Sequence, residues 1–207
     1  MEKYDKLVEL LMDGEDEEIV SAVDQLLDAG IPAGEILQEG LIHGMELVGE
    51  AFEKETLFIP EMLAAALTMK EGVERLKPLL TEEDKKSTGK VVFATVEGDI
   101  HDIGKNLCIV MLEGAGFDII DMGVDVNVLE IIETVQKENP QVLCLSALLS
   151  ATMPAMAEVV TSFKEKGIKT KVLIGGAPVT QEFADKIGAD AYADDASECV
   201  SVVKQLV

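Results

Sequence analysis

From residue 90 onward, short apolar runs rich in β-branched residues alternate with stretches of helical periodicity. The apolar runs are KVVFATV, FDIIDMG, QVLCLSA, KVLIGGA and the shorter ADAYAD. Helices are expected around residues 103–115, 127–138, 153–166, 179–187 and 196–206. This alternation is typical of crossover units, in which a helix joins two parallel strands. The second part of the chain is therefore predicted to form a five-stranded parallel sheet with helices on both faces.

The first part of the chain shows helical spacing throughout. Four segments carry the pattern: YDKLVELLM, EEIVSAVDQLLDAG, AGEILQEGLIHGMELVGEAFEKE and PEMLAAALTMKEGVERLKPLL. Gly30 is expected to end one helix, and Pro60 suits the first turn of another. A four-helix bundle is therefore predicted to precede the sheet.

A polar segment separates these two parts. TEEDKKSTGK, residues 81–90, contains no apolar residue and mixes charges with Ser, Thr and Gly, as exposed linkers do. The predicted organisation is a helical cap domain over residues 1–84, a linker over 81–90 and a Rossmann-like (flavodoxin-like) α/β domain over 90–207. The acids are concentrated in the first part, with 22 acids and 6 bases in residues 1–84 and 18 acids and 11 bases thereafter.

Charge and composition exclude several classes of partner. A formal net charge of −23 disfavours nucleic acid and anionic membranes, since both are polyanions. The sequence shows neither a secretory h-region nor a run of about 18 apolar residues, so a cytoplasmic location is expected. Cys108, Cys144 and Cys199 are far apart and form no CxxC pair, which favours buried thiols over a zinc or redox site.

Three common enzyme motifs are missing from the sequence. It contains no GxGxxG fingerprint and no GxxxxGK[ST] loop, so dinucleotide and P-loop triphosphate binding lack their main support. It also lacks a GxSxG nucleophile elbow, which makes a Ser-His-Asp hydrolase a weak interpretation.

Polar and small residues follow three of the predicted strands. Asp99, His101 and Gly104 follow the first strand, Ser146 follows the third, and Gly175 and Gly176 follow the fourth. Ligands of open parallel sheets bind beyond the carboxyl ends of the strands, close to the point where the strand order reverses. These residues are therefore expected to gather at one edge of the sheet.

Asp99 and His101 suit a metal site that needs one protein ligand. In an extended loop residues i and i+2 point the same way, so the Asp99 carboxylate can accept the His101 N–H and leave the other ring nitrogen free. One ligand cannot hold a bare ion, but it suffices where a macrocycle supplies the equatorial ligands, as in haem proteins. From these residues alone, a histidine that only satisfies a loop hydrogen bond is an equally good interpretation.

The spacing of three groups of residues along the sequence helps to decide between these two interpretations of His101. Between Asp99-x-His101-x-x-Gly104 and Ser146-x-Leu148 lie 41 residues, and 26 residues lie between Leu148 and Gly175-Gly176. This pattern resembles the cobalamin-binding domains of methionine synthase, corrinoid-dependent mutases and methanogen or acetogen corrinoid proteins. AFEKETLFIPEMLAAALTM is similar to the helical cap that precedes this domain in methyl-transferring members. The chain thus resembles the corrinoid methyl-carrier proteins of anaerobic methyltransferase systems.

The resemblance implies a role for each matching residue. His101 would be the lower axial ligand of cobalt in a cobalamin or related corrinoid. Asp99 would hold the second ring nitrogen of His101, and Thr152 would complete this hydrogen-bonded relay. The remaining residues expected at the cofactor are Asp102, Ile103, Gly104, Ser146, Leu148, Ser150, Gly175 and Gly176. The glycine pair would leave room for the nucleotide tail, although a tight strand-to-helix turn explains it equally well. Asn127 stands where many members carry proline.

The implied function is methyl carriage by a subunit that has no catalytic residue of its own. A substrate-specific methyltransferase would load the methyl group, a tetrahydrofolate-dependent methyltransferase would accept it, and a reductive activase is a further expected partner. A cobalamin-sensing regulatory module is the alternative, although no basic DNA-binding segment precedes the helices. In a third interpretation, a flavodoxin-like or receiver-like domain, His101 and the spacing would be coincidental.

Overall fold

A computed structural model describes residues 3–81, 84 and 87–207, which form two compact units. The helical unit comprises residues 1–87 with 114–116, and the α/β unit comprises 88–113 with 117–207. The predicted linker over residues 81–90 lies partly outside the described residues, since 82–83 and 85–86 are not among them.

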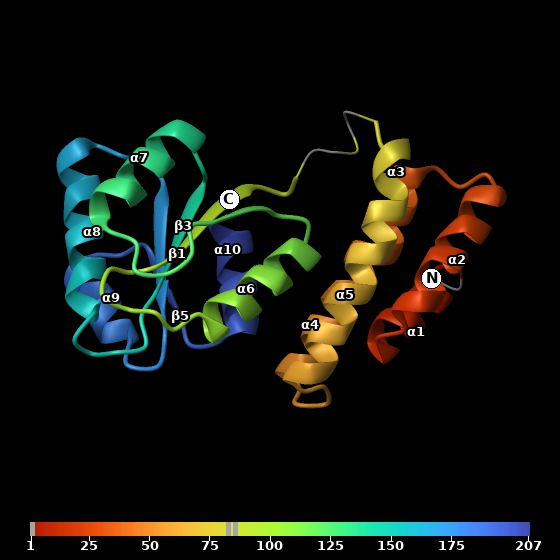
Figure 1. Cartoon of the computed structure of the whole chain (residues 1–207), viewed down its shortest axis with the longest axis horizontal. Helices are drawn as coiled ribbons and strands as arrows, with labels where there is room; N and C mark the ends of the chain where they lie inside the picture. Colours follow the sequence, from red (N-terminus) through yellow and green to blue (C-terminus); the bar gives the residue numbers. More distant parts are fainter. Residues whose placement is uncertain (1–2, 82–83, 85–86) are drawn as a thin grey trace. The chain divides into compact units, whose positions relative to one another are not determined.

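The helical unit contains the predicted bundle of four helical stretches (Figure 1). They are α1 (Asp5–Asp13), α2 (Asp16–Asp28), a continuous stretch of α3 (Ala33–Glu35), η1 (Ile36–Ile42) and α4 (His43–Glu53), and α5 (Ile59–Leu76), which the 3₁₀ turn η2 (Lys77–Leu79) extends. Among the described residues, no helix has both the length and the apolar composition needed to cross a membrane.

Glycines let α1 pack closely against the other helices. A Cβ atom added at Gly40 would lie 2.7 Å from Cδ1 of Leu7, and one at Gly44 would lie 2.5 Å from Cδ1 of Leu11. Leu7 and Leu11 are almost fully buried. The apolar face of α1 therefore fills the space that the two glycines leave open.

The third helical stretch differs from its prediction in one respect. The sequence predicts one regular helix over residues 33–55, whereas Ile36–Ile42 is a π-helix within it. π-Helical turns are rare, and their backbone hydrogen bonds span five residues instead of four. Apolar periodicity near 3.6 does not distinguish such a segment from an α-helix, so the sequence could not reveal it.

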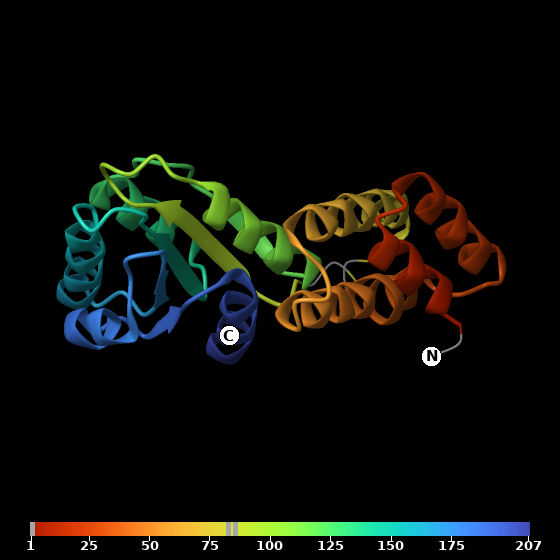
Figure 2. The ribbon, with the colours of Figure 1, turned by 90° about the horizontal axis from the view of Figure 1, so that it is seen from below.

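The α/β unit contains the predicted five-stranded sheet, with all strands parallel in the order β2-β1-β3-β4-β5. The strands are β1 (Lys90–Thr95), β2 (Asp118–Asp121), β3 (Val142–Ser146), β4 (Lys171–Gly175) and β5 (Ala191–Ala193). The helices are α6 (Ile103–Gly114), α7 (Val128–Glu138), α8 (Met153–Lys166), α9 (Gln181–Ile187) and α10 (Ala196–Leu206). Helices cover both faces of the sheet (Figure 2).

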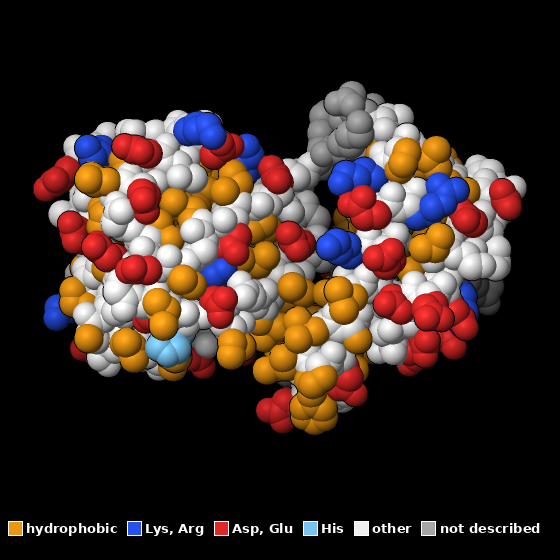
Figure 3. Space-filling view, in the orientation of Figure 1, with side chains coloured by type: hydrophobic (Ala, Val, Ile, Leu, Met, Phe, Trp, Pro, Cys, Tyr) orange, Lys and Arg blue, Asp and Glu red, His pale blue; other side chains and the backbone are white. Residues whose placement is uncertain are grey.

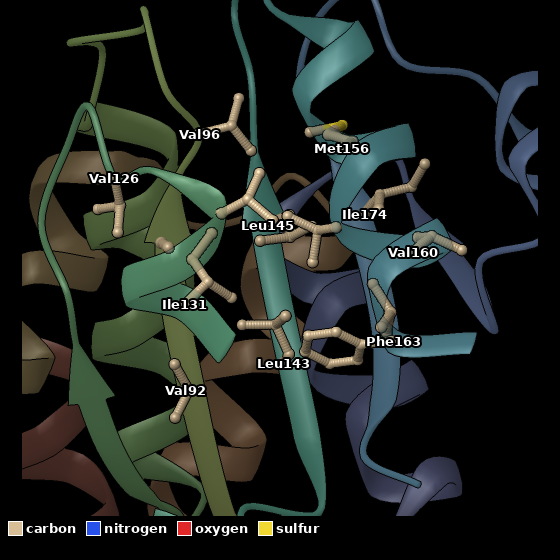
Figure 4. Close-up of a cluster of buried hydrophobic side chains, with 14 of the residues drawn as sticks. Val92, Val96, Val126, Ile131, Leu143, Leu145, Met156, Val160, Phe163 and Ile174 are labelled. Atoms are coloured by element: carbon tan, nitrogen blue, oxygen red, sulfur yellow. The ribbon is translucent and has the colours of Figure 1, made fainter. Parts of the chain in front are cut away.

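Both faces of the central strands are buried, as expected for a sheet covered on both sides. On one face, Val92 of β1 and Leu143 and Leu145 of β3 pack with Phe163 and Met156 of α8 (Figure 4). The residues that alternate with them in β1 and β3 are buried as well. The uninterrupted apolar runs in the sequence reflect this double burial.

Strand register aligns the carboxyl ends of four strands. Thr95 pairs with Ser146, Ser146 with Gly175, and Gly175 with Ala193. The segments that leave β1, β3, β4 and β5 therefore begin at one level of the sheet, which is the edge that the sequence indicates as the binding edge.

The three cysteines are free thiols within the α/β unit. Cys144 and Cys199 are buried as predicted, whereas Cys108 on α6 is only half-buried. A hydrogen bond with Cys199 and burial raise the pKa of the Cys108 thiol well above its ordinary value. Cys108 is therefore a protonated thiol rather than a reactive thiolate.

Candidate functional site

The site is built around the buried carboxylate of Asp99, in the loop of residues 96–102 that joins β1 to α6, here called the histidine loop. Oδ1 of Asp99 lies 2.8 Å from Nδ1 of His101 and accepts the His101 backbone N–H at 3.1 Å. Oδ2 accepts backbone N–H groups of Leu148 at 2.8 Å and Leu149 at 3.2 Å. Asp99 thus joins the histidine loop to the β3–α8 loop.

These hydrogen bonds keep Asp99 ionised. Burial alone would raise its pKa, but the His101 ring, the Thr152 hydroxyl and the backbone N–H groups of His101 and Leu148 favour the charged form. The hydrogen bonds outweigh burial, so the pKa of Asp99 lies well below its usual range. A carboxylate is therefore present at every physiological pH.

The Asp99 carboxylate determines which nitrogen of His101 is available. An ionised carboxylate only accepts hydrogen bonds, so Nδ1 of the ring must carry the hydrogen and act as the donor in the hydrogen bond to Asp99. In the neutral imidazole Nε2 is then left with its lone pair. The side chain of His101 is 47% exposed. The arrangement can therefore present one oriented nitrogen ligand to a metal centre.

Thr152, the residue before α8, completes the relay. Its hydroxyl lies 2.8 Å from Oδ2 of Asp99 and 2.8 Å from the carbonyl oxygen of Leu149. The hydroxyl has one proton, and the charged carboxylate is the stronger acceptor. We therefore assign the donated proton to Asp99, which makes a continuous chain from Thr152 through Asp99 to His101.

The other residues of the predicted set occupy the same edge in different environments. Ser146 is half-buried at the end of β3, whereas Ser150 is exposed in the loop that follows. Asp102 is half-buried, and its carbonyl oxygen accepts the Asn106 N–H at 2.7 Å as α6 begins. Ile103, the first residue of α6, is 80% exposed.

The glycines of the pattern differ in what surrounds them. A Cβ atom at Gly176 would collide with the carbonyl oxygen of Ala147, and Gly176 has a φ of +125°. A Cβ atom at Gly175 would lie 2.9 Å from the carbonyl oxygen of Ala193. By contrast, a Cβ atom at Gly104 would meet nothing within 4 Å. The backbone itself requires the glycine pair, whereas Gly104 leaves open space beside the site.

Exposed apolar side chains surround the histidine. Ile100 is 72% exposed, Leu148 is 45% exposed and Leu149 is 43% exposed. The space-filling view shows a histidine of the α/β unit with hydrophobic side chains beside it (Figure 3). Apolar side chains gathered around a polar ligand are typical of a surface that binds a large organic group.

Sequence reasoning missed the role of Lys105. Its side chain is 1% exposed, and its ammonium lies 2.6 Å from Oδ1 of Asp121 at the end of β2. The signal was present, because Lys105 shares a helical face with the buried Ile109 and Leu112. A buried lysine needs a partner for its charge, and the carboxylate of Asp121 supplies it.

Asn127, which stands where proline was expected from the resemblance, caps α7. Its side chain oxygen accepts the N–H groups of Leu129 at 3.0 Å and Glu130 at 3.1 Å. The departure from the pattern is therefore accommodated within the loop.

A bare metal ion has no multidentate site in the part of the chain that the structure describes. There, no three His, Cys, Asp or Glu side chains gather in a way that could hold one. The single nitrogen of His101 instead suits a metal whose other ligands come from a macrocycle.

Comparison with protein families and known proteins agrees with this chemistry. Residues 89–201 and residues 4–77 each match a family described as a B12 binding domain. Trimethylamine corrinoid protein 1 of Methanosarcina acetivorans is 43% identical over 197 residues, which are 93% of this chain and 91% of that protein. Dimethylamine corrinoid protein 1 of the same organism is 46% identical over 176 residues, which are 84% and 83% of the two chains.

Solved structures extend the similarity. A chain of the methanol:cobalamin methyltransferase complex MtaBC from Methanosarcina barkeri superposes with a TM-score of 0.91 at 30% identity, covering 99% of this chain and 79% of that one. A cobalamin-binding protein from Desulfitobacterium hafniense superposes with a TM-score of 0.80 at 32% identity, covering 98% and 97%.

Proposed function

This chain belongs to the B12-binding family that includes the methylamine corrinoid proteins, and we propose that it carries a methyl group on corrinoid cobalt between two methyltransferases. Its cofactor is a corrinoid. The observation that carries the proposal is the Asp99–His101 pair, which leaves one ring nitrogen of a half-exposed histidine free among exposed apolar side chains.

The residues at the sheet edge fit such a cofactor. Nε2 of His101 would be the lower axial ligand of the cobalt, and the exposed side chains of Ile100, Leu148 and Leu149 would cover part of the apolar macrocycle. The open space beside Gly104 leaves room that no protein side chain fills. Ser146 and Ser150 would contact the polar nucleotide tail.

The cofactor, when bound, supplies a cobalt centre that can take up and release a methyl group. The protein residues provide position and charge. Asp99 keeps the proton on Nδ1 of His101 and so holds Nε2 ready as a neutral ligand. Thr152 donates to the same carboxylate and, with Leu148 and Leu149, fixes its orientation.

We propose a methylamine as the source of the methyl group. The supporting observation is that sequence identity reaches 46% with a dimethylamine corrinoid protein and 43% with a trimethylamine corrinoid protein. The partners would be a methylamine-specific methyltransferase and a methyl-accepting methyltransferase, for which the family resemblance suggests a tetrahydrofolate-dependent enzyme.

Reconstitution with a corrinoid tests the proposal. The purified protein is mixed with hydroxocobalamin, and free cofactor is removed. A coloured protein whose visible spectrum shows coordination by histidine is expected, and His101→Ala should lose that spectral component. His43→Ala, which removes the other histidine of the chain, is the matched control and should leave the spectrum unchanged. A protein that never retains the corrinoid would refute the proposal.

A transfer assay separates a carrier from a cobalamin sensor. The methylated protein is incubated with each candidate methyltransferase, and demethylation of the cofactor is followed by its spectrum. Enzyme-dependent loss of the methyl group is the result expected for a carrier. Tight corrinoid binding without transfer to any partner would favour the sensor.

A further inference from the structure

We propose that Asp125 is the positioning residue of the histidine loop: it fixes the backbone around Asp99 so that the His101 ring is in place before a corrinoid binds. Asp125 lies between β2 and α7, outside the motif that suggests the cofactor. The inference deepens the proposed function, because it rests on His101 as the ligand.

Two hydrogen bonds from one residue bracket the peptide between Gly98 and Asp99. Oδ1 of Asp125 accepts the Gly98 N–H at 2.7 Å. The backbone N–H of Asp125 donates to the carbonyl oxygen of Asp99 at 2.9 Å. The Asp99 carboxylate is hydrogen-bonded to the His101 ring, so a shift of this peptide would shift the ring as well.

Both residues of this contact have left-handed backbone conformations, which are unfavourable for Asp125 but not for a glycine. Asp125 has a φ of +54° and Gly98 has a φ of +81°. A non-glycine residue pays about 1 kcal/mol or more in this region, and Asp and Asn tolerate it better than most. Such conformations persist where the surrounding structure determines them, and they gather at functional sites.

Neighbouring contacts hold the two loops together, and the Asp99 N–H of the bracketed peptide donates to the carbonyl oxygen of Val96 at 3.1 Å within the histidine loop. Val96 and Val126 form an isolated parallel bridge, and the Thr95 N–H donates to the carbonyl oxygen of Gly123 at 3.0 Å. The Thr95 hydroxyl donates to the carbonyl oxygen of His101 at 3.1 Å. These bonds lie before and after Gly98 and Asp99. The bond to Val96 lies within the histidine loop, so Asp125 supplies the restraint that ties this peptide to the loop between β2 and α7.

Three variants of Asp125 separate its side-chain bond from its backbone conformation. Asp125→Ala removes the acceptor and disfavours the left-handed φ. Asp125→Gly removes the acceptor but permits that φ. Asp125→Asn keeps both an oxygen acceptor and the tolerance of positive φ, so it should rescue the site. Asn139→Ala is the matched control, because Asn139 also has a positive φ, of +47°, but ends α7 at the opposite end of the helix.

The first measurement uses the corrinoid-free protein. Amide hydrogen exchange is followed by NMR at Gly98 and His101, and the free energy of unfolding is measured in parallel. Asp125→Ala and Asp125→Gly should exchange about tenfold faster at Gly98, as expected for loss of one charged hydrogen bond. Asp125→Asn and Asn139→Ala should retain the wild-type exchange at this amide. Unchanged protection in both Asp125→Ala and Asp125→Gly would overturn the inference.

The second measurement uses the protein loaded with hydroxocobalamin. The fraction of cofactor coordinated by histidine is read from the visible spectrum, and the dissociation constant is measured by titration. Asp125→Ala and Asp125→Gly should lower the histidine-bound fraction and weaken binding about tenfold, whereas Asn139→Ala should lose stability without changing either value. Wild-type coordination in the first two variants would count against Asp125. If the wild-type protein binds no corrinoid, the proposed function fails, and the exchange measurement alone then decides whether Asp125 positions the loop.

Discussion

At the scale of single residues, the site depends on a buried carboxylate whose partners all favour its charge. Asp99 accepts from the histidine loop through Oδ1 and from the β3–α8 loop through Oδ2. Removal of one partner from a buried group costs more than a typical hydrogen bond, because the group stays desolvated. The fold and the ligand histidine therefore depend on the same side chain.

Asp99→Asn should make the stability of the protein less dependent on pH. Because the folded-state pKa of Asp99 is depressed, its ionised form stabilises the fold above the unfolded pKa of about 4 and loses that contribution as the pH falls toward the folded value. The variant should be about 2 kcal/mol less stable at pH 7, and the gap should narrow below pH of about 4. Urea unfolding between pH 7 and pH 3 measures both effects.

The control for this experiment is Asp118→Asn, which changes an exposed aspartate in the same sheet. It should stay within about 0.5 kcal/mol of the wild type at pH 7. A gap between Asp99→Asn and the wild type that is constant across the whole pH range would contradict the assignment.

Gly104→Ala should weaken corrinoid binding without harming the fold, whereas Gly176→Ala should destabilise the fold. Alanine has open space at position 104 within α6 and should raise stability by about 0.5–1 kcal/mol, while its methyl group should weaken corrinoid binding. At position 176 the methyl group would collide with the backbone, and we expect a loss of about 3 kcal/mol or more. Thermal unfolding and corrinoid titration of both variants test the contrast, which fails if Gly104→Ala binds the cofactor normally.

At the scale of elements, the Lys105–Asp121 pair ties the first turn of α6 to the end of β2. The side chain of Lys105 is 1% exposed, whereas that of Asp121 is 42% exposed. Asp121 also accepts the Gly123 N–H at 2.9 Å, so it shapes the loop that carries Asp125. Because only Lys105 is buried, removal of the lysine and removal of the aspartate should lower the free energy of unfolding by different amounts.

Asp121→Ala should destabilise the protein more than Lys105→Met. Loss of the carboxylate leaves a buried ammonium without its counterion, which costs about 3 kcal/mol, whereas an apolar replacement of the lysine costs about 1 kcal/mol or less. The double variant should be more stable than Asp121→Ala, because it removes the unpaired charge. Chemical denaturation of the three proteins measures this. The pair is not acting as described if Lys105→Met is the most damaging change.

Much of the element pattern could be predicted from the sequence. The five strands and their helices were expected from uninterrupted apolar runs alternating with helical periodicity, since both faces of each central strand are buried. The π-helix of η1 was not expected, because its apolar pattern resembles that of an α-helix.

The candidate site could be predicted in part. A parallel sheet places the residues after β1, β3 and β4 at one edge, so Asp99, Ser146 and Gly175 could be expected together. Asp125 could not be found in this way. Its contact with Gly98 depends on a left-handed backbone conformation in a loop, which no spacing in the sequence specifies.

At the scale of the whole molecule, the negative net charge determines how the stability of the protein responds to salt. A formal net charge of −23 creates self-repulsion, while exposed ion pairs contribute about 0–1 kcal/mol each. Added salt screens both effects, and with so large an excess of acids the relief of repulsion should prevail. Salt is therefore expected to stabilise the protein.

Raising NaCl from 0.05 to 0.5 M at pH 7 should increase the midpoint of thermal unfolding by a few degrees, as about 1 kcal/mol corresponds to about 2–4 °C for a chain of this size. The control is the same titration near the isoelectric point of about 4.3, where the salt effect should disappear. A midpoint that falls with salt at pH 7 would show that attractive pairs outweigh repulsion.

The two edge strands of the sheet are short. β2 has four residues, with an exposed aspartate at each end, and β5 has three residues. Unpaired backbone groups on long, flat edges recruit strands from other chains and start fibrous aggregates. Short edge strands flanked by acidic residues offer little template for such growth. The protein should therefore not form amyloid-like polymers at high concentration.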